Sequence, residues 1–130
     1  MSWQTYVDTN LVGSGRISRA AIMGAQGGMW AASAGYQLTA AEQKALVDGF
    51  SQPDTLRSTT VRLDNQRYYV VSVRPQGVKV TVESKKQRNG ALLIKTRRAI
   101  IVAEYTAPTE RTEALFIADG VADHLVGAGY

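Results

Sequence analysis

The chain has 130 residues, with 15 basic and 11 acidic side chains and a net charge of +4 at neutral pH. This length suits one domain with a buried core and leaves little room for a second, so we expect a single domain over residues 1–130. The absence of cysteine excludes disulfides and thiolate metal sites, and it favours a reducing, cytoplasmic compartment. The chain does not open with a basic and apolar leader, and its apolar runs are too short to cross a bilayer.

The first third of the chain predicts a short amphipathic helix followed by a β-hairpin. Ser2 is a favourable N-cap, and Gly13 and Gly15 are expected to end the helix. Two strands follow, over residues 17–23 and 29–33, and the glycines between them allow the positive φ of a hairpin turn. The apolar positions of the helix recur at helical spacing and are Trp3, Tyr6, Val7 and Leu11.

A second helix is expected to begin after Thr39. Thr39 and Glu42 have the spacing of a capping box, in which the hydroxyl and the carboxylate each accept a hydrogen bond from a free amide of the first turn. The apolar residues that this helix is expected to bury are Leu46, Val47 and Phe50.

Between residues 61 and 105 the pattern changes to β-rich runs. Turn-forming residues interrupt these runs at residues 64–65, 75–77 and 85–90, which predicts a meander of four or five antiparallel strands. A further break before Ala99, at Arg97 and Arg98, contains no turn residue, so the pattern does not define its geometry.

The positive charge is concentrated in the same part of the chain. Residues 57–98 contain 11 Lys and Arg but only 2 acids, a net charge of +9, while the rest of the chain has a net charge of −5. Such segregation predicts a basic face that meets an acidic protein, anionic lipid headgroups or nucleic acid. The alternative is a set of solvated cations on edge strands and turns, which need no partner.

Pro108 and Thr109 precede a final amphipathic helix. Phe116 falls nearly opposite the apolar stripe of this helix, so it is expected to point to solvent as a candidate contact residue. The alternative is a single exposed apolar residue without a function. The inward stripe consists of Ala114, Ile117, Ala118, Val121 and Leu125.

The order of these elements predicts an α+β fold. A central antiparallel sheet is expected to carry the N- and C-terminal helices side by side on one face and a smaller helical segment on the other.

Signatures of catalysis are scarce. The chain has one histidine and no cysteine, and neither glycine-rich segment, 13–15 or 24–28, has the spacing of a phosphate-binding loop. A lone His124 beside an apolar stripe is more often a packing or surface residue than a base, and metal ligation would need further ligands. We therefore expect a protein that is not an enzyme and that has no cofactor or metal.

Aromatic residues near both chain ends are the strongest functional signal. If the terminal helices are antiparallel neighbours, their rings meet, and a strand contributes one more. Rings with N–H or O–H tips suit a proline-rich peptide, because the polyproline II helix is already extended and its carbonyls accept hydrogen bonds. The alternative, slightly favoured by periodicity alone, is that the two tryptophans are core residues. The residues concerned are Trp3, Tyr6, Trp30, His124 and Tyr130.

Four segments spread over the whole chain resemble the profilin family, in particular the short profilins of plants, algae and protists. They are residues 2–8 (SWQTYVD), residues 27–33 (GGMWAAS), the turn at Lys85 and Lys86 ahead of Gly90, and residues 123–130 (DHLVGAGY).

This resemblance implies a cytoplasmic, cytoskeletal protein with three kinds of partner: monomeric actin, proline-rich segments of actin-nucleating and elongating proteins, and anionic phosphoinositide headgroups. It implies that the aromatic residues named above bind polyproline. It also implies an actin-binding face on the later strands and the outer side of the last helix, comprising Arg67, Tyr69, Arg74, Lys85, Lys86, Arg88, Glu113, Phe116 and Asp119.

Two other interpretations remain open at this stage. One is an adaptor that binds polyproline and phosphoinositides but has weak or no actin binding. The other is a basic nucleic-acid-binding domain. The second is disfavoured because no single-strand-binding motif accompanies the bases and tyrosines of the meander, so we expect no nucleic-acid partner.

Overall fold

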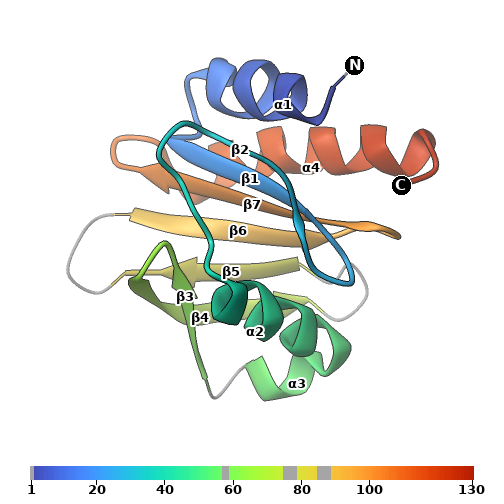
Figure 1. Ribbon diagram of the computed structural model, residues 1–130. Coiled ribbons are helices and arrows are strands. Elements are labelled where there is room, and N and C mark those ends of the chain that lie inside the picture. The colour runs from blue at the N-terminus through green and yellow to red at the C-terminus, as the bar shows by residue number, and fades with distance from the viewer. Residues whose placement is uncertain (1, 57–58, 75–78, 85–88) are drawn as a thin grey trace.

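A single seven-stranded antiparallel sheet forms the centre of the molecule, with strand order β2-β1-β7-β6-β5-β4-β3 (Figure 1). The computed structural model describes residues 2–56, 59–74, 79–84 and 89–130. The strands are β1 Arg19–Gly24, β2 Met29–Ala32, β3 Thr60–Leu63, β4 Gln66–Arg74, β5 Lys79–Glu83, β6 Asn89–Lys95 and β7 Ala99–Thr106. The predicted hairpin is therefore β1–β2, and the predicted meander consists of five strands, β3 to β7.

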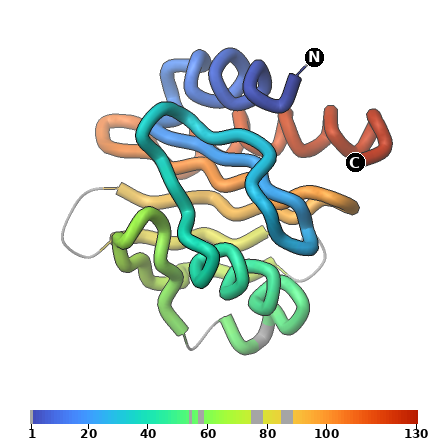
Figure 2. The backbone as a smooth tube through the Cα atoms, in the orientation of Figure 1, coloured from blue at the N-terminus to red at the C-terminus, as the bar shows by residue number. Residues whose placement is uncertain are grey.

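Helices cover both faces of this sheet. They are α1 Trp3–Thr5, the π-helix η1 Tyr6–Leu11, the 3-10 helix η2 Val12–Ser14, α2 Ala40–Ser51, α3 Pro53–Leu56 and α4 Arg111–Gly127. The tube view shows the N-terminal helical segment beside α4, with both chain ends at the same end of this pair, so the two run antiparallel (Figure 2). The predicted α+β fold is confirmed.

The N-terminal helical segment begins as predicted but continues with a wider turn. The hydroxyl of Ser2 accepts a hydrogen bond from the Thr5 amide at 3.1 Å. From Tyr6 onwards the segment is a π-helix, in which the Val12 amide donates to the Val7 carbonyl five residues earlier. A π-turn shifts side-chain positions relative to an α-helix. Val7 and Leu11 are nevertheless fully buried, so the wider turn keeps both on the sheet side.

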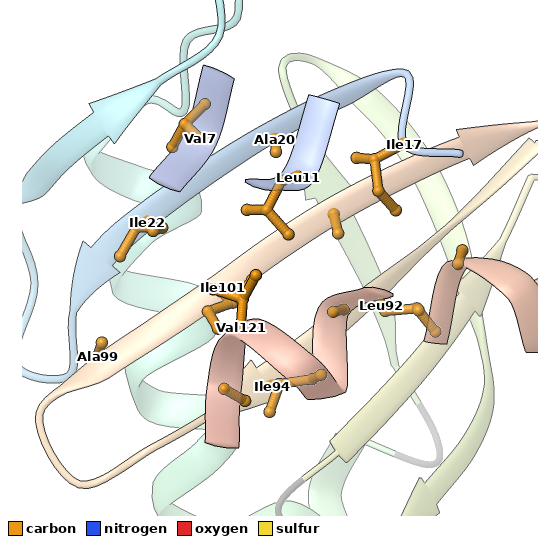
Figure 3. Close-up of a cluster of buried hydrophobic side chains, with 14 of the residues drawn as sticks. Val7, Leu11, Ile17, Ala20, Ile22, Leu92, Ile94, Ala99, Ile101 and Val121 are labelled. Carbon is orange, nitrogen blue, oxygen red and sulfur yellow. The ribbon is translucent and has the colours of Figure 1, made fainter. Parts of the chain in front are cut away.

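Two hydrophobic cores lie on opposite faces of the sheet. On one face, Val7 and Leu11 pack with Val121 of α4 over Ile22 and Ile101 of the sheet (Figure 3). On the other face, Leu46 and Phe50 of α2 pack against the sheet, with Val47 only half-buried at the edge. Burying each large aliphatic side chain contributes about 1.5 to 3 kcal/mol, so the first core is enough to hold the two terminal helices together.

The predicted starts of the second and last helices are confirmed. The capping box at α2 is present, since Thr39 accepts from the Glu42 amide at 3.1 Å and Glu42 accepts from the Thr39 amide at 2.9 Å. The last helix, Arg111–Gly127, follows Pro108 and Thr109 as predicted. Its N-cap is Glu110, whose amide donates to the Glu113 carboxylate at 3.1 Å.

A buried ionic network crosses the sheet beneath the loop that follows β2. Glu104 is 1% exposed, and it accepts hydrogen bonds from Arg19 at 2.9 Å and from the Tyr68 hydroxyl at 2.6 Å. The Arg19 guanidinium also pairs with Asp64 at 3.0 Å and lies 4.7 Å from the centre of the Tyr36 ring. A carboxylate this deeply buried is costly unless it is paired and hydrogen-bonded. The network therefore ties β1, β4 and β7 together.

Burial and the Glu104 charge together alter the acidity of this network. The pKa of Tyr36 is raised above its ordinary value, mainly by burial and secondly by the negative charge of Glu104. The pKa of Tyr68 is raised by burial and by its hydrogen bond to Glu104. For Arg19, burial alone would lower the pKa, but the hydrogen bond and charge of Glu104 outweigh it and raise the pKa. The folded state therefore favours neutral tyrosines and a cationic arginine.

Replacing Arg19 by Met is expected to lower the free energy of unfolding by about 2 to 3 kcal/mol, because the buried Glu104 loses its cation. Denaturant unfolding measures this change. The exposed Arg62 on β3 provides a matched control, and Arg62→Met should change stability by less than about 0.5 kcal/mol. Adding Glu104→Gln to Arg19→Met should recover part of the loss. Equal effects of Arg19→Met and Arg62→Met would contradict the role of the network.

Stability is expected to fall as the pH rises above about 10, the ordinary tyrosine pKa. In that range the unfolded state releases tyrosine protons that Tyr36 and Tyr68 retain when folded, so folding is favoured below this pH and progressively less above it. Denaturant unfolding at several alkaline pH values checks the direction. Tyr68→Phe should reduce the slope, and stability that rises with alkaline pH would contradict the assignment.

Candidate functional site

Five rings meet at one end of the terminal helices. They come from α1, η1, β2, α4 and the residue that ends the described chain, and are Trp3, Tyr6, Trp30, His124 and Tyr130. We call them the aromatic cluster. Trp3 is its centre, with ring centroids 4.6 Å from Trp30, 4.8 Å from Tyr130 and 5.8 Å from Tyr6. These are distances at which aromatic pairs attract one another. The sequence-based prediction that these five rings are neighbours is therefore met by the geometry.

A hydrogen bond joins the two helices within the aromatic cluster. The Tyr6 hydroxyl and His124 Nε2 are 3.0 Å apart, and the two rings lie 5.5 Å from centroid to centroid. Both residues carry a polar tip beside an apolar face. The pair can therefore present a donor to a ligand carbonyl while its rings offer flat contact area.

Three local contacts position the tryptophans. Ser2 caps the helix that carries Trp3, and the Gln4 amide donates to the Ala32 carbonyl at 2.8 Å, which ties α1 to β2. A Cβ at Gly24 would lie 3.2 Å from the Trp30 indole nitrogen and 2.8 Å from the Gly27 carbonyl. The missing side chain at Gly24 thus makes room for the Trp30 ring against the hairpin.

Tyr130 is held by the turn between β6 and β7. Its main-chain carbonyl accepts hydrogen bonds from the Arg98 amide at 2.6 Å and from the Thr96 hydroxyl at 2.7 Å. The Thr96 hydroxyl also accepts from the Ala99 amide at 3.1 Å. This turn is the break that contains no turn residue, and its shape depends on a partner 34 residues away along the chain. Sequence reasoning missed Thr96 because nothing local marks it.

The rings remain accessible. Trp30 is 36% and Tyr130 37% exposed, so neither is a core residue. The alternative interpretation of the tryptophans as core residues is therefore wrong for Trp30, while Trp3 is half-buried and packs against the core from its margin.

A hollow of about 320 Å³ adjoins the aromatic cluster between the N-terminal helical segment and α4. We call it the interhelical groove. Tyr6 and His124 line both the cluster and this groove. Of its other lining residues, sequence reasoning singled out only Phe116 as a contact residue, and it did so for actin. The others are Asn10, Ile117, Gly120 and Val121.

The second predicted site is the actin-binding face. It lies on the part of the sheet that the terminal helices do not cover. Arg67 is exposed and lies directly opposite Arg62 on the neighbouring strand β3. Arg74 is also exposed and lies opposite Lys79 on β5. Residues directly opposite in an antiparallel pair share a face. Lys79 makes an ion pair with Asp119 of α4 at 2.8 Å, so this face is the one beside α4. We call it the basic face, and its exposed cations are Arg62, Arg67 and Arg74.

The other residues predicted for actin are distributed around this face. Half-buried Tyr69 lies on it, opposite Glu83. Phe116 is 79% exposed, as predicted for the outer side of the last helix. Glu113 instead pairs with Arg16 at 2.7 Å, on the side of α4 away from Asp119. Three predicted residues, Lys85, Lys86 and Arg88, lie outside the described residues.

Within the described ranges, 2–56, 59–74, 79–84 and 89–130, there is no helix of the length and apolar character that a membrane crossing requires.

Comparisons with known proteins agree with this architecture over the whole chain. The profilin family model matches residues 1–130. Profilin of Schizosaccharomyces pombe is 40% identical over the full length of both chains. A solved structure of that profilin has a TM-score of 0.92 at 37% identity, covering 99% of this chain and 100% of its own. Mouse profilin IIa, in complex with a double repeat from the FH1 domain of mDia1, shares the fold with a TM-score of 0.82 at 18% identity, and both chains are fully covered. The chain belongs to the profilin family.

Proposed function

We propose that this chain regulates actin polymerisation by binding actin monomers and links them to proline-rich ligands. The aromatic cluster carries the proposal, because five rings from the terminal helical segments, β2 and Tyr130 meet, with Trp30 and Tyr130 exposed. Family membership supports both the actin and the polyproline parts. The protein acts by binding, as one domain and without a catalytic step of its own, and it works in the cytoplasm at the actin cytoskeleton.

The aromatic cluster suits a polyproline II helix for physical reasons. Proline rings stack on flat aromatic faces, and the extended helix loses little conformational entropy on binding. The Tyr6 and His124 pair provides polar tips for ligand carbonyls. The complex of mouse profilin IIa with an FH1 double repeat supports a peptide as the ligand class.

Actin is proposed to bind the basic face together with the adjoining side of α4. The exposed arginines give this face a positive potential that would steer an acidic partner and make association decrease with salt. Phe116 adds an exposed apolar ring on α4. The carboxylate of Asp119 is already neutralised by Lys79, so it orients that cation and adds little net charge.

Phosphoinositide headgroups are proposed to bind the same basic face. They are anionic, and the exposed cations gather on one side of one sheet. Because both ligands would use the same arginines, lipid headgroups and actin are expected to exclude one another.

The second candidate is an adaptor that binds polyproline and phosphoinositides with weak or no actin binding. One observation favours it, since both acidic residues expected to contact actin, Glu113 and Asp119, are paired within the molecule at 2.7 and 2.8 Å. Sedimentation or fluorescence binding to monomeric actin separates the two candidates.

Tyr6→Ala is expected to weaken binding of a proline decamer at least tenfold, because it removes a ring and the hydrogen bond to His124. The only two tryptophans of the chain, Trp3 and Trp30, lie in the aromatic cluster, so their fluorescence reports the titration. Tyr69→Ala, on the basic face, is the matched control and should leave decamer binding intact while weakening actin binding. A flat fluorescence titration of the unmodified protein would refute the polyproline site.

Arg67→Glu is expected to weaken actin binding about tenfold and to reduce its salt dependence, because a steering charge is reversed. Lys44→Glu makes the same charge change at an exposed residue of α2, which covers the opposite face of the sheet. It should have little effect on actin binding. Neither change should alter decamer binding. Equal loss of both ligands with Arg67→Glu would contradict the two-surface arrangement.

Phosphoinositide micelles added to a preformed complex with actin are expected to release actin, and Arg67→Glu should weaken the lipid as well. Actin binding that does not respond to the micelles would count against a shared surface.

A further inference from the structure

The turn between β6 and β7 carries positive charge that neither of the two proposed surfaces uses. Three of the four residues 95–98 are basic, namely Lys95, Arg97 and Arg98. Lys95 is half-buried, and its ammonium group donates to the Thr96 carbonyl at 3.4 Å, whereas both arginines are exposed. In the described part of the chain, no ion pair involves either guanidinium group. We call Arg97 and Arg98 the arginine pair.

The side chains of the arginine pair are not what shapes this turn. The turn is held by main-chain groups of Arg98, whose amide donates to the Tyr130 carbonyl at 2.6 Å and whose carbonyl accepts from the Ala25 amide at 2.9 Å. Every residue except proline offers the same amide and carbonyl. The two guanidinium groups repel one another, and a bound anion would relieve this repulsion. The two side chains are therefore available for a ligand.

The same main-chain contacts place the arginine pair at the edge of the aromatic cluster. One contact leads directly to Tyr130. The other leads to Ala25 in the hairpin turn, next to Gly24, where a Cβ would lie 3.2 Å from the Trp30 indole nitrogen. Trp30 and Tyr130 are both exposed. In Figure 1 the hairpin turn, the turn after β6 and both chain ends lie at the same end of the molecule. The arginine pair thus borders two exposed rings.

This position determines which part of a ligand the arginine pair can contact. Prolines carry no charge and stack on the rings, so the guanidinium groups add nothing to their recognition. A residue that adjoins the prolines and leaves the aromatic cluster over the turn comes within reach of these groups. Guanidinium groups form paired, charge-assisted hydrogen bonds with carboxylates, whereas they repel lysine and arginine. The chemistry that fits is therefore an acidic residue at one end of the proline segment.

We propose that the arginine pair selects proline-rich ligands in which acidic residues directly flank the prolines. The inference rests on the proposed binding of polyproline at the aromatic cluster. It adds a requirement on the ligand outside its prolines, and it places the contact on a turn of the sheet. Ion pairs between exposed side chains are individually weak, so this contact discriminates among proline-rich ligands and supplies only a small part of the affinity.

The test compares three peptides with blocked ends by tryptophan fluorescence. They are a proline decamer, the decamer preceded by two aspartates and the decamer followed by two aspartates. At low salt, one aspartate peptide is expected to bind about threefold to tenfold more tightly than the decamer, because two exposed charge pairs form. The end that carries the effective aspartates gives the direction of the bound chain. The preference should shrink as salt is added, because exposed charges are screened.

Arg97→Glu and Arg98→Glu are expected to reduce this preference for aspartate or abolish it, while binding of the decamer stays unchanged. Both variants retain the main-chain groups that hold the turn. Lys44→Glu makes the same change in net charge at an exposed residue of α2, on the opposite face of the sheet from the terminal helices. It should keep the preference. This control separates a local contact from general attraction between an acidic peptide and a basic protein.

The outcomes separate this inference from the proposed function. A preference for aspartate that is lost in either arginine variant and kept in the control supports the inference. Equal affinity of the three peptides overturns it and leaves the polyproline function standing. A preference that survives both arginine variants also overturns it, and weaker binding of phosphoinositide micelles by those variants would then assign the arginine pair to lipid. If the unmodified protein does not bind the decamer, the polyproline function is wrong, and this inference with it.

Discussion

The packing of the N-terminal helical segment and α4 on the same sheet face determines where the rings of Trp3, Tyr6 and His124 lie. Val7 and Leu11 are fully buried against β1, β7 and α4, and they occupy the same π-helix as Tyr6. At about 1.5 to 3 kcal/mol for each buried side chain, this core accounts for a sizeable part of the stability of a small protein. The proposed ligand surface therefore depends on a buried hydrophobic contact that lies outside it.

The same arrangement separates two surfaces on one rigid element. One side of α4 faces the interhelical groove through Gly120 and His124, and the other pairs with β5 through Asp119. Because an α-helix of 17 residues positions its side chains on all sides, α4 can serve two ligands without changing shape. Simultaneous binding of the two proposed ligands would then need no conformational switch.

Local patterns in the sequence predict much of this molecule because short-range chemistry determines the elements. The Ser2 cap, the capping box at Thr39 and the exposure of Phe116 follow from spacing alone. The features that the sequence does not reveal are contacts between residues far apart along the chain. The carboxylate of Glu104 finds Arg19 across 85 residues, and the turn at Arg98 takes its shape from the carbonyl of Tyr130. The π-helix also escapes prediction, since helical periodicity does not distinguish its wider turn.

The contact between Tyr130 and the turn after β6 has a thermodynamic consequence for the aromatic cluster. Hydrogen bonds from Thr96 and Arg98 to its carbonyl, and from its amide to the Leu125 carbonyl, hold the main chain of Tyr130 in place. Segments held by a few contacts open locally at a smaller free-energy cost than global unfolding. The apparent affinity for a ligand that needs all five rings is the intrinsic affinity multiplied by the fraction of molecules in which Tyr130 is docked. Any influence on the local equilibrium of Tyr130 would therefore tune the proposed peptide binding while the core stays folded.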